Sequence, residues 1–150
     1  MRIYIDTSVI GGIFDSEFSE VTALFFSQAK DNKYEIIIST VVEKELELAP
    51  ENVKNYFEKE KKNLKIVNIT DKDISLQRSY LEQKIVTEKY ALDALHVAIA
   101  STNECQIIVS WNFKHIVNFQ KIPLYNAINM IKGYNSIQIF SPMEVINYEE

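Results

Sequence analysis

Three acidic side chains, Asp6, Glu45 and Asp93, have the type and the setting of ligands for a divalent cation. Carboxylate oxygens are the ligands that Mg²⁺ and Mn²⁺ prefer, whereas a zinc site needs cysteine or histidine ligands. The chain contains one cysteine and two separated histidines, so zinc is disfavoured. Clustered carboxylates that hold one or two divalent ions activate water and neutralise the charge on a phosphate. The chemistry that these residues predict is therefore hydrolysis of a phosphodiester bond.

Asp93 is singled out by its neighbours. It lies in segment 90–100, which is apolar on nearly every side of a helix and should therefore be buried. A buried aspartate is costly unless it is paired, hydrogen-bonded or bound to a metal. Lys89, four residues earlier, could supply a structural partner instead, so Asp93 indicates a metal site mainly in combination with Asp6 and Glu45.

Short apolar segments alternate with helical patterns along the chain. Apolar and aromatic runs predict strands at residues 2–5, 34–38, 64–69, 106–109 and 137–140. Apolar residues at helical spacing predict helices at 16–32, 50–62, 71–83, 87–103 and 123–132, with others opening at Ser39-Thr40, after Asn112 and at Ser141. Gly11 and Gly12 predict a break after the first strand. The fold class is therefore α/β: a three-layer α/β/α sandwich around a central, mainly parallel sheet of four or five strands, in one domain spanning residues 1–150.

The predicted strand ends bring further polar side chains to one edge of the sheet. In open parallel sheets, ligands bind beyond the carboxyl ends of the strands. The small polar residues at these ends are candidate substrate contacts: Thr7, Ser8, Ser39 and Ser110. For Thr7 and Ser8, capping of the turn after the strand is an equally good interpretation.

Bulk composition limits the kinds of partner and the cellular setting. The net charge is −5, from 16 basic and 21 acidic side chains, so nucleic acid could be bound only through local positive charge. The single cysteine, Cys105, fits a reducing cytoplasm. No apolar run approaches the length of a membrane span, so we expect a cytoplasmic protein without a membrane partner.

Four segments in this order resemble the acidic-site motifs of the PIN-domain family. They are Ile-Asp-Thr-Ser-Val-Ile at 5–10, the segment 38–46, Leu-Asp-Ala-Leu-His-Val-Ala at 92–98, and Val-Ser-Trp-Asn-Phe-Lys-His at 109–115. The likeness extends over about the first 120 residues, and small single-domain chains of this kind most resemble the VapC-type toxins. The resemblance implies an endoribonuclease that depends on Mg²⁺ or Mn²⁺, is usually a homodimer, and is inhibited by a neighbour-encoded antitoxin.

The resemblance also implies roles for particular residues. Asp6, Glu45 and Asp93 would hold the metal, and Asn112 would assist catalysis through its carbonyl oxygen. PIN nucleases commonly have an aspartate at the position of Asn112, so this chain has one charge fewer there. Lys114 and His115 are candidate contacts to RNA phosphate, although a solvated pair is an equally good interpretation.

Two other functions were compared with the ribonuclease hypothesis. A PIN scaffold that has lost catalysis and binds RNA or protein is supported only by Asn112. A phosphatase with an aspartate nucleophile is disfavoured, because such sites need a second aspartate where this chain has Ser8. We also expect a dimer contact or an antitoxin groove, because the early helices carry more aromatic side chains than one buried face needs. These side chains are Phe14, Phe18, Phe25, Phe26, Tyr56 and Phe57.

Overall fold

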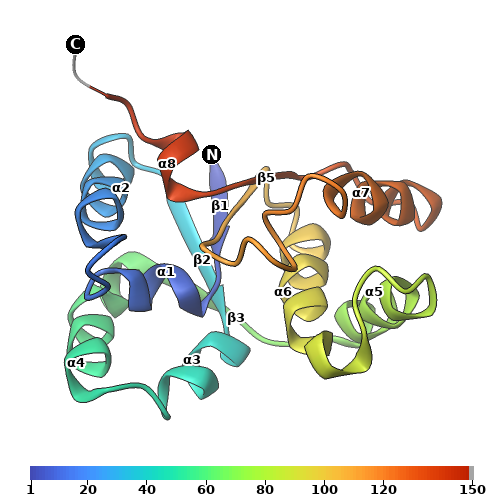
Figure 1. The fold of residues 1–150 in the computed structure, drawn as a ribbon, viewed down its shortest axis with the longest axis horizontal. Coiled ribbons are helices and arrows are strands. Elements are labelled where there is room, and N and C mark those ends of the chain that lie inside the picture. The colour runs from blue at the N-terminus through green and yellow to red at the C-terminus, as the bar shows by residue number, and fades with distance from the viewer. Residues whose placement is uncertain (149–150) are drawn as a thin grey trace.

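A five-stranded parallel sheet forms the centre of the computed structural model, which describes residues 1–148 (Figure 1). The strand order is β3-β2-β1-β4-β5, so β1 lies in the middle with β2 and β4 on either side. The strands are β1 (Arg2–Ile5), β2 (Glu35–Ser39), β3 (Leu64–Val67), β4 (Ile107–Val109) and β5 (Gln138–Phe140). This confirms the expected mainly parallel sheet.

Alternate residues of the central strand enter two separate apolar cores. Ile3 and Ile5 face one core, and Tyr4 between them faces the other. Ile3 pairs in register with Ile36 of β2 and with Ile107 of β4, so each face has a continuous apolar row. A parallel sheet buried on both faces needs such rows, since helices cover both sides.

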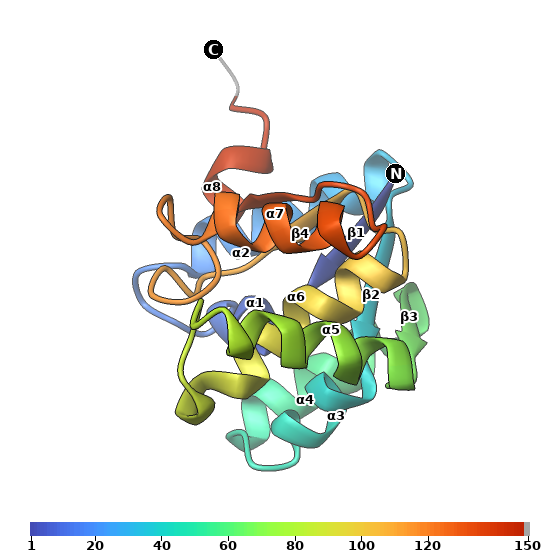
Figure 2. The same cartoon turned by 90° about the vertical axis from the view of Figure 1, so that its right-hand side faces the viewer.

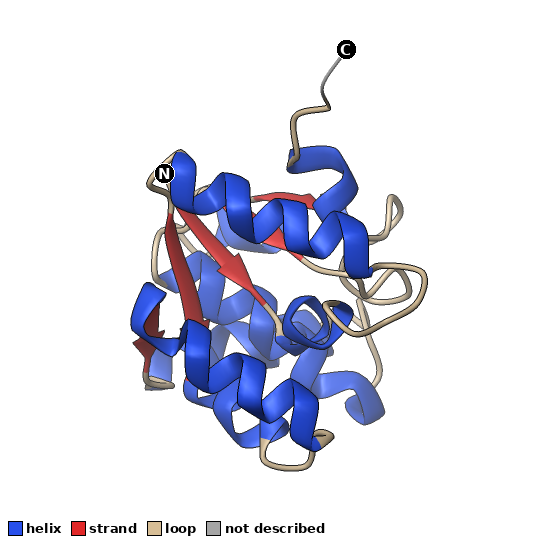
Figure 3. Ribbon diagram, turned by 90° about the vertical axis from the view of Figure 1, so that its left-hand side faces the viewer, coloured by secondary structure: helices blue, strands red, loops and turns tan. Residues whose placement is uncertain are grey.

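Two layers of helices cover the sheet. On one face lie α1 (Thr7–Gly12), α2 (Ser19–Asp31), α3 (Thr40–Leu46) and α4 (Glu51–Glu60), whose apolar residues join the core of Ile3 and Ile5. On the other face lie α5 (Asp71–Glu82), α6 (Ala91–Thr102) and α7 (Ile122–Ile131), which face the viewer in Figure 2. Two short 3₁₀ helices, η1 (Lys61–Asn63) and η2 (Glu88–Tyr90), and the terminal α8 (Pro142–Val145) complete the elements. In Figure 1 the strands lie between the two groups of helices, and Figure 3 shows the sheet from the side of α2 and α4, which confirms the three-layer α/β/α sandwich.

The connections after β1 and β4 differ from the sequence-based expectation. Gly11 and Gly12 do not break the chain, because both belong to α1, which ends at Gly12. The short helix expected after Asn112 is wrong, since residues 113–116 form turns. The backbone N–H groups of Ile116 and Val117 both donate to the carbonyl of Asn112, so no helical ladder continues from there.

No helix within residues 1–148 combines the length and the apolar character needed to span a membrane.

The adjacent glycines of α1 give a matched pair of stability predictions. A Cβ at Gly12 would lie 2.8 Å from Trp111 Nε1 and 2.9 Å from Thr22 Oγ1, two atoms that are hydrogen-bonded to each other. A Cβ at Gly11 meets nothing within 4 Å. Gly12→Ala should therefore destabilise the fold by about 1–3 kcal/mol through overpacking.

Gly11→Ala should instead stabilise the protein by about 0.5–1 kcal/mol, because alanine has the better helix propensity. Urea denaturation of both variants measures the difference. Equal effects of the two substitutions would show that Trp111 does not pack tightly against α1.

Candidate active site

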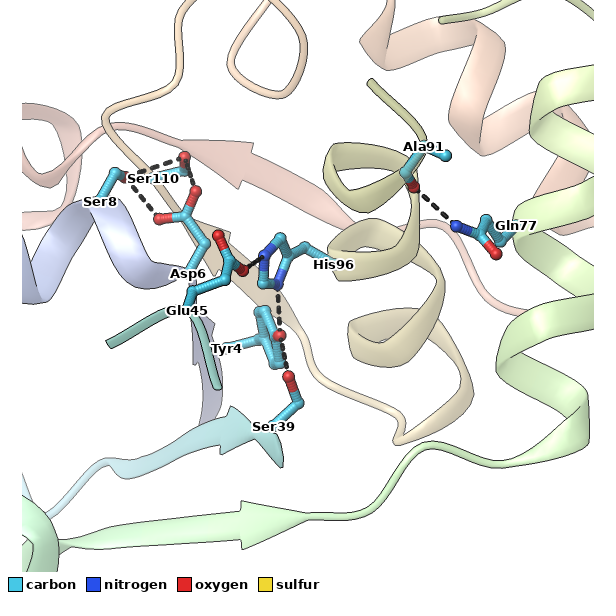
Figure 4. A network of polar contacts seen from close by, with 9 residues as sticks. All are labelled: Tyr4, Asp6, Ser8, Ser39, Glu45, Gln77, Ala91, His96 and Ser110. Atoms are coloured by element: carbon cyan, nitrogen blue, oxygen red, sulfur yellow. Dashed lines mark hydrogen bonds and ion pairs between the residues drawn. The ribbon is translucent and has the colours of Figure 1, made fainter. Parts of the chain in front are cut away.

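The Asp6 carboxylate lies at the carboxyl end of β1 and is held by two serine hydroxyls (Figure 4). Ser8 Oγ donates to Asp6 Oδ1 at 2.5 Å, and Ser110 Oγ donates to Asp6 Oδ2 at 2.7 Å. Asp6 is only 4% exposed. Because β4 lies directly beside β1, Ser110 reaches Asp6 across 104 residues of sequence.

Backbone groups fix the two hydroxyls that contact Asp6. Trp111 N–H donates to Ser8 Oγ at 2.9 Å, and Asn112 N–H donates to Ser110 Oγ at 2.9 Å. Each hydroxyl therefore accepts from a backbone amide and uses its own proton on the carboxylate. The segment after β4 thus sets the orientation of Asp6 before any ligand is bound.

A second chain of hydrogen bonds orients Glu45, which belongs to α3. His96 Nε2 lies 2.8 Å from Glu45 Oε1, and His96 Nδ1 lies 2.7 Å from Tyr4 Oη. A carboxylate can only accept, so Nε2 carries the proton and, in the neutral ring, Nδ1 accepts from Tyr4. Burial raises the pKa of Tyr4 well above its ordinary value, so its hydroxyl keeps the proton that it donates.

Ser39 completes this chain at its buried end. Its hydroxyl lies 2.9 Å from Tyr4 Oη, and because Tyr4 donates to His96, the Ser39 hydroxyl donates to Tyr4. The direction of donation runs from Ser39 through Tyr4 and His96 to Glu45. Ser39 is fully buried, so in this structure its hydroxyl is committed to Tyr4 and does not face substrate.

Asp6 and Glu45 interact electrostatically. Burial raises the pKa of Asp6 above its ordinary value, and the charge of Glu45 raises it further. His96 and the hydroxyls of Ser8 and Ser110 act in the opposite direction. The site therefore holds negative charge in a poorly solvated place, which is the setting that a cation would stabilise.

Asp93 is not placed as the sequence predicts. It is half-buried at the third position of α6 rather than inside an enclosed helix, because α6 begins only at Ala91 and the neighbouring Leu92 is exposed. Gln77 Nε2 anchors this start by donating to the carbonyl of Ala91 at 2.7 Å. Burial lowers the pKa of His115, and the charge of Asp93 opposes that shift. Burial raises the pKa of Tyr125, and the charge of Asp93 adds to that shift. The structure thus brings Asp6 and Glu45 together, with Asp93 on the side of His115.

Asn112 and the residues predicted to contact substrate differ in how exposed they are and in what they bind. Asn112 Oδ1 accepts from the backbone N–H of His115 at 3.0 Å, so its carbonyl oxygen caps the following turn. The hydroxyl of Thr7 is buried and has no hydrogen-bond partner among residues 1–148. Lys114 is exposed, whereas the ring of His115 is buried. Ser110 is fully buried and serves Asp6.

The sequence analysis left both Tyr4 and His96 outside the candidate site. Tyr4 looks like an ordinary aromatic residue of a buried strand, so its hydroxyl gave no signal. For His96 the available signal was its spacing, one helical turn after Asp93. Both bonds of His96 connect segments distant in sequence, which a one-dimensional pattern does not contain.

The donor set at this edge fits Mg²⁺ or Mn²⁺. Asp6 and Glu45 offer oxygen ligands, and Mg²⁺ is commonly bound by one or two carboxylates, with water and substrate phosphate completing the shell. Among residues 1–148, no three acidic, histidine or cysteine side chains are close enough to form a complete protein metal site. Of the three acids predicted to form one group, the structure therefore places two, Asp6 and Glu45, at the same site.

Comparison with known proteins identifies the family. The PIN domain family model matches residues 3–114, and the chain therefore belongs to the PIN domain family. No curated protein matches the chain.

Solved structures share the fold along nearly the whole chain. One is described as VapBC2 from Rickettsia felis bound to a DNA fragment from their promoter: TM-score 0.63, 17% identity, covering 94% of this chain and 98% of that one. Another is FitAcB from Neisseria gonorrhoeae: TM-score 0.61, 14% identity, covering 95% of this chain and 99% of that one. At these identities the likeness establishes the fold.

Proposed function

We propose that this protein is a metal-dependent endoribonuclease that cleaves RNA phosphodiester bonds, and that it is the toxin of a type II toxin–antitoxin pair. The observation that carries the proposal is the buried Asp6 carboxylate, held by Ser8 and Ser110 and lying near Glu45. This pair lies at the carboxyl edge of the sheet in a chain of the PIN domain family, whose members are generally nucleases.

The residues of the site have separate roles in this proposal. Asp6 and Glu45 would hold Mg²⁺ or Mn²⁺, and Asp93, at the start of α6, is the third proposed ligand. A divalent ion at this position would supply an activated water and would offset the charge of the phosphate. Ser8 and Ser110 keep both oxygens of Asp6 oriented, and His96 keeps Glu45 oriented. Asn112 contributes by capping the turn that carries Lys114.

The proposed partners are RNA, an antitoxin and a second copy of the chain in the cytoplasm. Support for an antitoxin comes from the two structural neighbours, which are described as VapBC2 and FitAcB. The aromatic surplus of the early helices is mostly core, since Phe25, Phe26 and Phe57 are buried and Phe18 and Tyr56 pack against the same core. Large apolar residues that stay exposed on other segments are better candidates for partner contacts: Leu48, Phe119, Met130 and Ile131.

Cleavage of mixed single-stranded RNA by the purified chain tests the enzymatic proposal. We expect cleavage with Mg²⁺ or Mn²⁺ and none after chelation with EDTA, because two carboxylates alone cannot neutralise the phosphate. Cleavage that persists at full rate in EDTA contradicts the metal-dependent mechanism. Co-expression with the reading frame immediately upstream tests the toxin role, since an antitoxin should relieve growth arrest.

A PIN scaffold that binds RNA without cutting it is the second candidate. It is favoured by Asn112, which brings no charge and whose side-chain oxygen accepts from the His115 amide. The same assay separates the candidates, because a scaffold retains RNA at every metal concentration without producing fragments.

A further inference from the structure

Aromatic and cationic side chains cluster at the start of α6, next to Asp93. Tyr90, the last residue of η2, is half-buried, and its ring lies against the ring of His115 with centroids 3.9 Å apart. The ammonium groups of Lys89 and Lys114 lie 5.5 Å and 5.3 Å from the centre of the Tyr90 ring. Two segments distant in sequence, 88–90 and 113–116, thus meet around one tyrosine.

The lysines of this cluster carry uncompensated charge. Within the described part of the chain, neither Lys89 nor Lys114 forms an ion pair, and the neighbouring Glu88 pairs with Arg78. Both lysines are exposed. On a chain with a net charge of −5, binding of a polyanion depends on such local positive charge.

Phe113 adds an exposed aromatic ring to the segment that carries Lys114. Its side chain is 48% exposed, and it directly precedes Lys114. Its ring lies 6.1 Å from the ring of Trp111, whose backbone N–H holds Ser8. An exposed aromatic ring and an exposed ammonium group thus follow each other in the segment that links Trp111 to His115. We call the four residues Lys89, Tyr90, Phe113 and Lys114 the aromatic–lysine track.

His115 supports the track from behind. Its ring is buried, and neither ring nitrogen has a hydrogen-bond partner among the residues described. Its backbone is fixed on both sides, because its N–H donates to Asn112 Oδ1 and its carbonyl accepts from Tyr125 Oη at 2.8 Å. The buried ring of His115 thus packs against the Tyr90 ring and holds it in place, and does not itself reach phosphate.

We propose that the aromatic–lysine track binds single-stranded RNA, with unpaired bases stacking on its rings and its ammonium groups contacting phosphates. This inference rests on the proposed function, since the track would deliver the substrate to Asp6 and Glu45. Aromatic rings interleaved with cations are the chemistry of single-strand binding, because every base has a face that can stack. Bases within a duplex are already stacked and paired, so the track selects unpaired RNA.

Fluorescence anisotropy with a short labelled oligouridine tests the track in EDTA, where no metal or cleavage contributes. Tyr90→Leu and Phe113→Leu should each weaken binding by at least about fivefold, the loss expected for one base–aromatic stack. The double variant Lys89→Gln/Lys114→Gln should make the salt dependence shallower by about 1.4 in slope, or about 0.7 for each lost phosphate contact. A fully paired RNA should bind the wild type more weakly than oligouridine does.

Matched controls lie away from the track. Lys33, before β2, and Lys132, between α7 and β5, are exposed lysines near the amino edge of the sheet. Lys33→Gln/Lys132→Gln and Tyr148→Leu, which removes an exposed aromatic ring, should leave oligouridine affinity and salt slope unchanged. Circular dichroism verifies that the track variants fold.

The outcomes separate this inference from the proposed function. Wild-type cleavage with unchanged oligouridine binding in all track variants overturns the track and leaves the ribonuclease standing. Track-dependent binding without cleavage supports the track and contradicts the enzyme. Equal affinity for paired and unpaired RNA overturns the stacking role, and an absence of RNA binding overturns the whole inference.

Discussion

Asp6→Asn is expected to lower RNA cleavage by at least about a hundredfold, since losing a metal ligand should cost no less than losing an outer-shell partner. The amide keeps the size of the side chain but removes the charge that would hold the cation. Glu45 is an acidic side chain whose charge acts on Asp6, but it is itself a proposed ligand of the same site and so does not replace Asp6. Cleavage of mixed RNA at saturating Mn²⁺ is the measurement.

The same substitution should stabilise the metal-free protein near neutral pH. Burial raises the pKa of Asp6, so the folded state binds a proton more readily than the unfolded state. Stability from this group therefore increases as the pH falls through the raised folded pKa, and the penalty of the buried charge is fully present above that pKa. The advantage of Asp6→Asn should be largest near pH 7 and should vanish below the ordinary carboxyl pKa of the unfolded chain.

Asp15→Asn is the matched control, because Asp15 is exposed and its oxygen accepts from the backbone N–H groups of Glu17 and Phe18. An asparagine oxygen can accept the same bonds, so stability and cleavage should both remain. Thermal unfolding in EDTA at several pH values measures the stability difference. Near-normal cleavage by Asp6→Asn would remove Asp6 from the catalytic site.

Most strands and helices could be predicted because capping and turn residues mark where they begin and end. The helix expected at 71–83 is observed as Asp71–Glu82, where Thr70 and Asp73 form a capping box. Short elements were harder to predict from the sequence. The helix α1 has only six residues and ends in two glycines, so its local helix propensity is low. Its formation depends on tertiary packing of Val9 and Ile10.

The acidic residues of the site could be predicted from the sequence, whereas most of the hydrogen bonds that orient them could not. An aspartate directly after a central strand is visible in the sequence, and so are Ser8 and Ser110 at the strand ends. Their joint hold on Asp6 depends on β4 lying beside β1, although β2 and β3 come between them in the chain. The full burial expected for Asp93 was wrong because the 3₁₀ turn of residues 88–90 delays the start of α6.

His96→Leu is expected to weaken Mn²⁺ binding by about 10- to 100-fold, the usual effect of losing an outer-shell partner of a metal ligand. His96 is a positioning residue in this argument, since it holds Glu45 Oε1 at 2.8 Å. Leucine cannot donate, and Glu45, on the partly exposed α3, would then sample several rotamers. Ser39 still satisfies the hydroxyl of Tyr4, so the fold should survive.

Isothermal titration with Mn²⁺ measures this effect without relying on activity, and the other histidine provides its control. His115→Phe preserves a ring against Tyr90 and removes two buried nitrogens that have no partner among residues 1–148. His115→Phe should leave Mn²⁺ affinity unchanged, because the hydrogen bond to Glu45 belongs to His96. Tyr4→Phe should give a smaller loss than His96→Leu, since it removes only the bond that fixes the ring from behind. Equal Mn²⁺ affinity in wild type and His96→Leu would mean that His96 does not orient a metal ligand, and would leave Asp6 as the better-supported carboxylate of the site.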